Sequence, residues 1–215
     1  AVQPWRTGKV LSVIDETPNT KRYVIEIPEL EVFDFTPGQF ISFDLPIDDK
    51  PGRRLRSYSI ASWPDGTNKF ELVIVLNAEG KGTPWLFEYA VPGAELTLRG
   101  PQGVFHLPET LDRDIFFVCT GTGIAPFRSM CHHILNHNIP HQNLYLTFGT
   151  RKKSDLLYHE EMTQLEKDLP GFHYLPTLSR EEWDGRKGYV HSIYEELCSS
   201  KQPAYFYLCG WKNML

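Results

Sequence analysis

The chain has 215 residues, of which 41% are hydrophobic, and it carries a formal net charge of -5 at pH 7. This length suits two domains of about a hundred residues, each with an ordinary globular core. The negative charge does not favour nucleic acid as a partner, and the sequence shows neither an apolar run of membrane-spanning length nor a secretory signal. We therefore expect a monomeric globular protein of the cytoplasm that binds neither nucleic acid nor a membrane.

The cysteines exclude one kind of cofactor. Cys119, Cys131, Cys198 and Cys209 are scattered, without a Cys-x-x-Cys pair or the clustered spacing of a plant-type iron–sulfur centre. The sequence therefore predicts no iron–sulfur domain and no other metal site. It does not require disulfides, which favours a reducing compartment, and we expect Cys119 and Cys131 to be packed thiols.

The first half of the chain predicts six short strands separated by Pro, Gly and Asp. They are expected over residues 10–14, 22–27, 40–45, 55–61, 70–75 and 95–99. A series of this kind indicates an antiparallel β-barrel, which we assign to residues 1–108. A short helix is expected over residues 85–89, between the last two strands.

The strand over residues 55–61 combines a guanidinium group, an aromatic ring and several hydroxyls. Arg56 and Tyr58 are two positions apart, so they lie on the same face of the strand. The planar fork of an arginine can hold a pyrophosphate bidentately, beside a ring stacked on the cofactor. The alternative is an ordinary barrel strand in which Tyr58 packs and Arg56 pairs with a surface carboxylate.

A second phosphate site is predicted where a strand meets a helix. The apolar run over residues 114–119 suits a buried parallel strand, and the turn Gly121-Thr122-Gly123 follows it. Pro126 suits the first turn of the next helix, whose free N–H groups and dipole favour an anion. Because Pro126 replaces the third glycine of the usual dinucleotide fingerprint, a plain strand-to-helix turn is the alternative.

From residue 109 to residue 215, strands and helices alternate. Strands are expected over residues 115–119, 143–147, 173–177 and 204–208, and helices over residues 126–137, 158–168 and 190–198. This order predicts an α/β domain with a parallel sheet covered by helices. Cys209 follows the last strand, at the edge where such sheets bind ligands.

In their order along nearly the whole chain, these motifs resemble those of the ferredoxin-NADP reductase family. The matching segments are Arg56-Ser57-Tyr58-Ser59, Gly82-Thr83-Pro84-Trp85-Leu86, Gly100-Pro101-x-Gly103, Thr120 to Pro126, and Cys209-Gly210 with Met214. The resemblance implies a flavin-binding barrel followed by an NAD(P)-binding α/β domain, with Gly100 to Gly103 as the turn between the domains. It also implies a further helix and strand after Leu215, ending in an aromatic residue.

The resemblance implies a role for each residue of the flavin motif. Arg56 would hold the pyrophosphate of FAD, Tyr58 would stack on the isoalloxazine ring, and Ser59 would hydrogen-bond near flavin N5, with Ser57 in the same motif. Strand alternation alone would turn Ser59 to the face opposite Tyr58, so its catalytic role rests on the family. Further pyrophosphate donors would come from Lys81, Gly82 and Thr83, and helix capping is an alternative or additional role for Thr83.

The family likewise implies the nicotinamide-binding residues. They are Thr120, Gly121, Thr122, Gly123, Pro126, Cys209 and Gly210. Cys209 would act in catalysis by orienting the nicotinamide through contact and not as a nucleophile; the alternative is a core cysteine without a functional role.

Coenzyme choice depends on the residues near the adenosine ribose. Ser179, Arg180 and Arg186, the last with Lys187 beside it, resemble a site for the 2′-phosphate, and Arg151 would help with the adenosine phosphates. These cations predict NADP. The acidic residues Glu181, Glu182 and Asp184 lie between them and favour NAD as the alternative.

The two cofactors predict an enzyme that takes hydride from NADPH to FAD and passes electrons singly to ferredoxin or flavodoxin. The basic cluster Lys50, Arg53, Arg54 and Arg56 would steer an acidic carrier, or it belongs to a flexible loop in which only Arg56 has a ligand. Two other functions stay open. One is an NADH-dependent reductase component of a multi-chain oxygenase, and the other is a flavin-binding regulatory subunit without hydride transfer.

Overall fold

The computed structural model describes residues 2–200 and 202–210. The chain forms two compact units: unit 1 contains Ala1–His106 and Arg128–His133, and unit 2 contains Leu107–Phe127 and Ile134–Leu215. The domain boundary at residue 108 stays a prediction. No helix in the described part of the chain is long and apolar enough to span a membrane.

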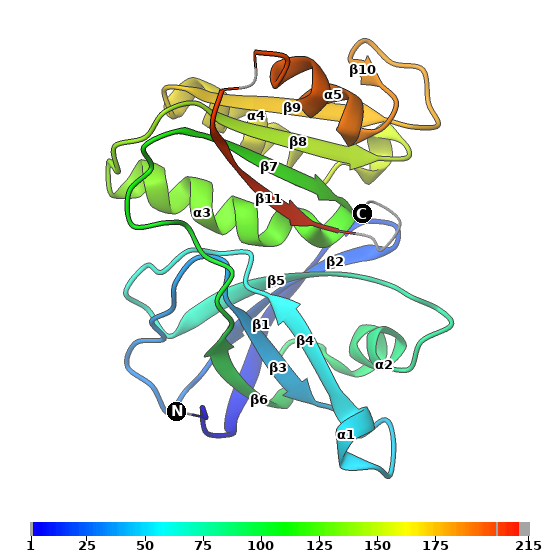
Figure 1. Ribbon diagram of the computed structural model, residues 1–215. Coiled ribbons are helices and arrows are strands. Elements are labelled where there is room, and N and C mark those ends of the chain that lie inside the picture. The colour runs from blue at the N-terminus through cyan, green and yellow to red at the C-terminus, as the bar shows by residue number, and fades with distance from the viewer. Residues whose placement is uncertain (1, 201, 211–215) are drawn as a thin grey trace. The chain divides into compact units, whose positions relative to one another are not determined.

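Unit 1 is built on a six-stranded antiparallel sheet with the strand order β4-β3-β6-β1-β2-β5 (Figure 1). All six predicted strands are confirmed, together with the short helix α2. The elements are β1 (Arg6–Thr17), β2 (Thr20–Glu26), β3 (Phe40–Asp44), α1 (Pro51–Arg54), β4 (Leu55–Ser59), β5 (Lys69–Val75), α2 (Gly82–Tyr89) and β6 (Glu95–Gln102). The two outer strands approach one another, since the Ala61 N–H donates to the Glu71 carbonyl at 2.8 Å just beyond β4.

The strands of unit 1 form because apolar side chains alternate along them and meet in one core. Tyr23, Ile25, Phe43, Phe70 and Leu98 are among the fully buried side chains of this core. Burial of such a cluster is the main favourable contribution to the stability of the sheet.

Two details of unit 1 differ from the sequence-based expectations. Helix α1 was not predicted, because four residues are too short for a helical pattern; Leu45 N–H donates to the Arg54 carbonyl at 3.1 Å and so joins the helix to the end of β3. Gly100 and Pro101 lie within β6, where the pairing with β3 shifts register, and they do not form a turn. Gly103 follows with a φ of 102°.

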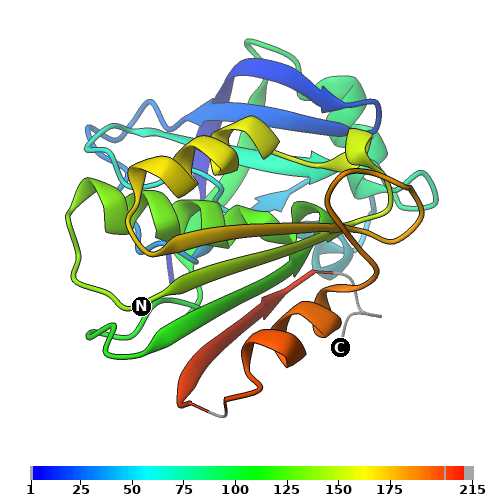
Figure 2. The same cartoon turned by 90° about the horizontal axis from the view of Figure 1, so that it is seen from above.

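Unit 2 contains a five-stranded parallel sheet with the order β10-β9-β8-β7-β11. The predicted strands and helices of this half are all present. The elements are β7 (Asp114–Thr120), the 3₁₀ turn η1 (Gly121–Ile124), α3 (Ala125–Asn136), β8 (Leu144–Thr150), η2 (Lys153–Asp155), α4 (His159–Asp168), β9 (Phe172–Leu178), β10 (Arg186–Lys187), α5 (Val190–Leu197) and β11 (Ala204–Cys209). Figure 2 shows α4 on one face of the sheet and α5 on the other.

The parallel register brings the carboxyl ends of the strands to one edge. In the strand register, Cys209 on β11 lies beside Cys119 on β7, and Cys119 lies beside Phe148 on β8. The loops that follow β7, β8 and β9 and the end of β11 therefore lie at the same edge of the sheet, which is where open α/β sheets bind ligands.

Candidate functional site

Arg56 lies on β4 with part of its guanidinium group already fixed. Its Nη1 donates to the carbonyl oxygens of Arg53 at 2.9 Å and of Leu55 at 2.7 Å. Within the described residues, its Nε and Nη2 make no hydrogen bond and no carboxylate pairs with it. The alternative of a surface ion pair is therefore wrong, and the donors on Nε and Nη2 remain uncommitted among the described residues.

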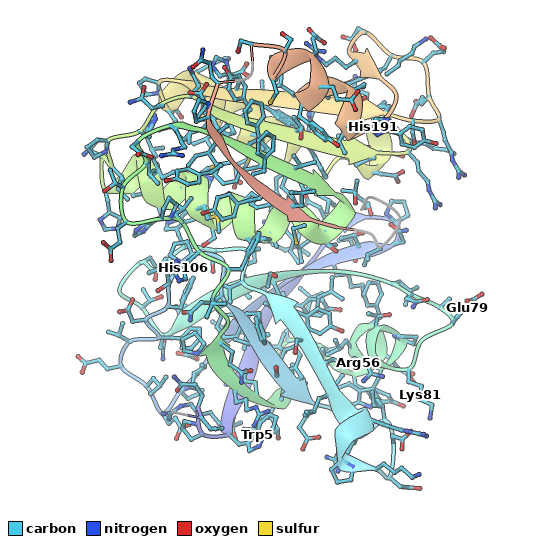
Figure 3. All side chains as sticks on the ribbon, viewed as in Figure 1. Trp5, Arg56, Glu79, Lys81, His106 and His191 are labelled. Atoms are coloured by element: carbon cyan, nitrogen blue, oxygen red, sulfur yellow. The ribbon has the colours of Figure 1, made fainter. Side chains whose placement is uncertain are left out.

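A glycine makes room for this guanidinium at the start of α2. A Cβ atom at Gly82 would lie 2.8 Å from Arg56 Nε and 2.9 Å from its Cγ. Figure 3 shows Arg56 and Lys81 on the side of unit 1 where α2 begins. No side chain in the described part of the chain caps α2, so its first backbone N–H groups are also open to an anion. An uncommitted arginine edge beside an uncapped helix start fits the pyrophosphate of FAD.

The neighbours of Gly82 are already engaged. Lys81 Nζ pairs with Asp48 Oδ2 at 3.1 Å, and the pKa of Asp48 is lowered first by the hydrogen bond from the Lys50 backbone N–H and then by that from Lys81. Thr83 Oγ1 accepts from Asn77 N–H at 2.8 Å and donates to the Asn77 carbonyl at 3.3 Å. Thr83 therefore does not cap α2, so that alternative is wrong. Its hydroxyl closes the loop over residues 77–83.

Tyr58 lies half-buried on β4, with its ring centroid 5.9 Å from that of Phe43. Burial raises the pKa of Tyr58 to about 12, and the charge of Arg56 acts in the opposite direction. The phenol is therefore neutral at physiological pH. Its stacking role stays a prediction.

Ser57 precedes Tyr58 on β4, and its hydroxyl contacts a polar side chain of β3. Its Oγ lies 2.8 Å from Ser42 Oγ, which donates to Gln102 Oε1 at 2.9 Å. Ser59 pairs with Phe40 and is partly buried. The alternation along β4 agrees with the expectation that Ser59 faces away from Tyr58, and the flavin N5 role of Ser59 stays a prediction.

The glycine turn after β7 contacts the end of β11. Thr120 ends β7, Gly121 has a φ of 53°, and Thr122 and Gly123 lie in η1. A Cβ atom at Gly123 would overlap the carbonyl oxygen of Cys209, and one at Gly210 would overlap Thr120 Oγ1. The structure thus brings together the predicted nicotinamide residues of two distant segments.

Pro126 is the second residue of α3, and this confirms its predicted place in the first helical turn. The N-terminus of α3 therefore follows the glycine turn, as a dinucleotide phosphate site requires. Met214, the last residue of the predicted Cys-Gly motif, lies outside the described residues.

Cys209 is only partly exposed, and burial raises the pKa of its thiol. The thiol is therefore protonated at neutral pH and is a poor nucleophile, which agrees with a contact role beside the nicotinamide. Cys119 and Cys131 are fully buried, so their assignment as packed thiols is confirmed. Among the described residues, no group of three His, Cys, Asp or Glu side chains could hold a metal ion.

The loops after β8 and β9 are joined by backbone hydrogen bonds. Ser179 N–H donates to the Thr150 carbonyl and Arg180 N–H donates to the Arg151 carbonyl, both at 3.0 Å. Ser179 Oγ also donates to the Thr150 carbonyl at 3.4 Å. The guanidinium groups of Arg151 and Arg180 have no partner in the part of the chain that the structure describes. Two uncommitted cations thus lie on adjacent loops at the ligand-binding edge of the sheet.

The other predicted cations of this region are held by carboxylates. Arg186 Nη1 donates to Glu196 Oε2 at 2.8 Å, and Lys187 pairs with Glu182. The hydrogen bond from Arg186 lowers the pKa of Glu196. Glu196 could not be predicted as a partner of Arg186 from the sequence, because it lies ten positions later on a different element.

Of the basic cluster in unit 1, Lys50 and Arg53 alone expose side chains with no partner among residues 2–200 and 202–210. Arg54 Nε pairs with Asp44 Oδ1 at 2.7 Å, and Arg56 Nη1 donates hydrogen bonds to backbone carbonyl oxygens. The expected docking surface therefore reduces to Lys50 and Arg53.

The fold and these two sites define a two-domain oxidoreductase that binds FAD and a nicotinamide dinucleotide. Residues 7–107 match the model of the oxidoreductase FAD-binding domain, and residues 117–215 match that of the oxidoreductase NAD-binding domain. Ferredoxin–NADP reductase B of Sorangium cellulosum is 33% identical, over 97% of this chain and 87% of that protein. The chain belongs to the ferredoxin-NADP reductase family of flavoenzymes.

Other relatives are longer than this chain. The electron transfer component of anthranilate 1,2-dioxygenase from Acinetobacter baylyi is 32% identical over 85% of this chain but only 52% of its own length. The crystal structure of the Amycolatopsis cytochrome P450 reductase GcoB is 28% identical with a TM-score of 0.87, and the match covers 100% of this chain and 64% of that one. The chain therefore spans only part of these two proteins.

Proposed function

We propose that this flavoenzyme takes hydride from NADPH and passes electrons singly to a small protein carrier such as ferredoxin or flavodoxin. The observation that carries the choice of NADPH is the pair Arg151 and Arg180, whose guanidinium groups are uncommitted within the described residues and lie on joined loops. Positive charge at this edge of the sheet favours a coenzyme with a 2′-phosphate. All four cysteines are free, which supports a reducing compartment such as the cytoplasm.

The residues of the chain would bind and orient the two cofactors. When bound, FAD supplies the chemistry that accepts a hydride and releases electrons one at a time. Arg56 and the start of α2 would hold its pyrophosphate, and Tyr58 would hold its ring. The glycine turn and Cys209 would position the nicotinamide, so that proximity and orientation are the main contribution of the protein.

An anaerobic titration of the flavin-loaded protein tests the coenzyme. We expect NADPH to bleach the visible absorption of the flavin at lower concentrations than NADH does. Arg180→Ala should raise the Kd for NADPH about tenfold, because it removes a charged hydrogen-bond donor, and should leave the Kd for NADH nearly unchanged. Arg113→Ala is the matched control, since Arg113 pairs with Asp112 before the amino end of β7.

Two results of this titration would contradict the proposal. Equal loss of affinity for both coenzymes in Arg180→Ala would remove Arg180 from the 2′-phosphate site. Full flavin occupancy without bleaching by either coenzyme would favour a flavin-binding subunit that performs no hydride transfer.

Charge reversal tests the carrier. The double variant Lys50→Glu/Arg53→Glu should slow the reduction of an acidic ferredoxin and flatten its dependence on salt, because exposed charges act mainly on association rates. Lys9→Glu, an exposed change on β1, is the control. Unchanged carrier reduction in the double variant would remove this surface from the proposal.

A second function is an NADH-dependent reductase component that serves an oxygenase on another chain. Two observations favour it: Arg186 and Lys187 are held by carboxylates, and a relative is named as the electron transfer component of a dioxygenase. Faster flavin bleaching by NADH than by NADPH, with electron delivery to an iron–sulfur protein, would select this function over the first.

A further inference from the structure

We propose that Glu196 sets the coenzyme selectivity of this protein by competing with the 2′-phosphate of NADPH for Arg186. The proposal rests on the proposed nicotinamide-coenzyme function and adds a residue that limits the preference for NADPH. Without the Glu196 carboxylate, Arg186 would join Arg180 as a second ligand of the 2′-phosphate.

The competing carboxylate is presented by a well-anchored element. Helix α5 buries Val190 and Ile193 against the sheet, and Glu196 follows three positions after Ile193. Its Oε2 accepts from Arg186 Nη1 at 2.8 Å, and the side chains are 41% exposed for Arg186 and 61% exposed for Glu196. The ion pair is therefore formed at a surface that a dissolved coenzyme can reach.

The backbone at Arg186 is fixed independently of Glu196. Arg186 pairs with Thr177 in the short parallel contact between β10 and β9, and Trp183 Nε1 donates to the Arg186 carbonyl at 2.6 Å. Gly188 N–H donates to the Leu178 carbonyl at 2.9 Å on the other side. A change at Glu196 should consequently release the guanidinium group without unfolding the loop.

The charge of the region shows why this competition matters. Residues 179–187 together with Glu196 contain three cations and four carboxylates. Glu182 holds Lys187 and Glu196 holds Arg186, which leaves Arg180 as the one uncommitted cation of this described segment. A phosphate with two negative charges would have to displace Glu196 to gain a second arginine ligand.

The size of the effect follows from the exposure of the pair. Exposed ion pairs are weak, so displacement of Glu196 should change the affinity for a 2′-phosphate about threefold. A coenzyme without that phosphate gains nothing from a released Arg186. Selectivity should therefore change while affinity for the rest of the nucleotide stays the same.

The test measures binding to the flavin-loaded full chain by calorimetry, with 2′,5′-ADP and 5′-AMP as probes. We expect Glu196→Gln to bind 2′,5′-ADP about threefold more tightly and 5′-AMP with unchanged affinity. Glu195→Gln is the matched control, because it removes the same charge from the neighbouring exposed position of α5, where Glu195 has no partner among the described residues. Glu196→Asp, which keeps a carboxylate for Arg186, should return the selectivity towards that of the wild type.

Two further variants separate the possible outcomes. In Arg186→Gln/Glu196→Gln the gain should disappear, because no guanidinium group remains to be released. An equal gain in Glu195→Gln, a gain that persists without Arg186, or weaker binding of both probes in Glu196→Gln would overturn the role of Glu196. Arg180→Ala separately tests the proposed function: if it leaves 2′,5′-ADP binding unchanged while Glu196→Gln strengthens it, the proposed phosphate ligand fails and the inference stands.

Discussion

The side chain of Arg56 occupies space that is open because residue 82 is a glycine without a Cβ atom. The guanidinium group is held to the backbone through Nη1, and it lies where a Cβ atom at Gly82 would be 2.8 Å from its Nε. The geometry therefore keeps one edge of the fork open beside the start of α2. A lysine at this position would offer a single point of charge and would lose the paired donors.

We expect Arg56→Lys to raise the Kd for FAD between about tenfold and a hundredfold, because a bidentate charged contact becomes a single one. Flavin fluorescence, followed as the flavin-free protein is titrated into FAD, measures this change. Arg53→Lys makes the same substitution three residues earlier on an exposed side chain and should leave the Kd unchanged. Equal affinities for FAD in Arg56→Lys and the wild type would show that the fork does not bind the pyrophosphate.

For single residues, the sequence predicts those roles that depend only on the neighbouring residues in the chain. Pro126 follows a strand and a glycine turn, so its place in the first turn of α3 could be read from its neighbours. The Thr83 bond to Asn77 and the Glu196 bond to Arg186 could not, because each depends on how a loop or helix folds back in space. Side-chain partners that are distant in sequence leave no periodic signal.

Among the elements, strand β5 carries a buried carboxylate between two arginines of unit 1. Glu71 Oε1 accepts from Arg22 Nη1 at 3.2 Å, and Glu71 Oε2 accepts from Arg128 Nη1 at 2.7 Å. Arg128 belongs to the segment of α3 that is part of unit 1, and its Nη1 also donates to the Ala61 carbonyl at 3.1 Å. The network joins β2, β5 and α3, with Glu71 and Arg128 buried and Arg22 partly exposed.

Glu71→Gln should lower the free energy of unfolding by about 3 kcal/mol, because it leaves the buried Arg128 without its counter-ion, whereas Arg22 keeps Glu16. Urea unfolding followed by circular dichroism gives this value. Glu95→Gln on β6 makes the same change at an exposed position and should alter stability by less than about 0.5 kcal/mol. Similar unfolding midpoints for both variants would show that the network contributes little.

The contact between η1 and β11 gives a second element-scale prediction. Gly123→Ala would place a methyl group on the Cys209 carbonyl and force the glycine turn and the strand apart. We expect a stability loss of about 1–3 kcal/mol from overpacking, together with weaker NADP⁺ binding. Thermal unfolding and calorimetry measure the two effects.

The control for this contact is Gly52→Ala, because no atom of the described residues lies within 4 Å of a Cβ atom at Gly52. It should leave coenzyme binding and stability nearly unchanged. Normal NADP⁺ affinity in Gly123→Ala would mean that the approach of β11 to the turn does not shape the nicotinamide site.

Elements with a strong pattern were predicted, and elements formed by chain reversal were not. The apolar runs of β7, β8 and β9 and the apolar spacing of α3 identify buried strands and a helix. The two-residue β10 has no pattern of its own and exists because Arg186 and Lys187 pair with Thr177 and Leu178. Helix α1 likewise has no pattern of its own and forms within the segment that connects β3 to β4.

For the molecule as a whole, buried tyrosine and cysteine side chains make stability fall at alkaline pH. Burial raises the pKa of Tyr58 to about 12 from an ordinary value of 10.0. Burial also raises the pKa of Cys131, Tyr23 and Tyr174. Above the ordinary values, the unfolded chain has released these protons and the folded chain still holds them. The free energy of unfolding must therefore fall as pH rises.

We expect this decline to begin near the ordinary cysteine pKa of 9.0 and to steepen above 10.0, where tyrosine titrates in the unfolded chain. Urea unfolding of the flavin-free protein at intervals of pH measures it. Tyr58→Phe should show a shallower decline between pH 10 and pH 12, because one of the retained protons is gone. Tyr189→Phe changes a tyrosine that is 67% exposed and is the control. Parallel curves for Tyr58→Phe and the wild type would contradict this explanation.

The pairing of β11 with β7 has a consequence for the order in which a newly made chain matures. Every segment of unit 1, including the arginine from α3 that binds Glu71, has been synthesised once residue 133 is reached. The sheet of unit 2 lacks β11 until residues 204–209 emerge, and only then can the Cys209 carbonyl meet Gly123. Since domains generally fold as units from the N-terminus during synthesis, we expect unit 1 to form on the ribosome before the sheet of unit 2 is complete. The residues proposed to bind FAD are thus translated before the last residues of the proposed nicotinamide-coenzyme site.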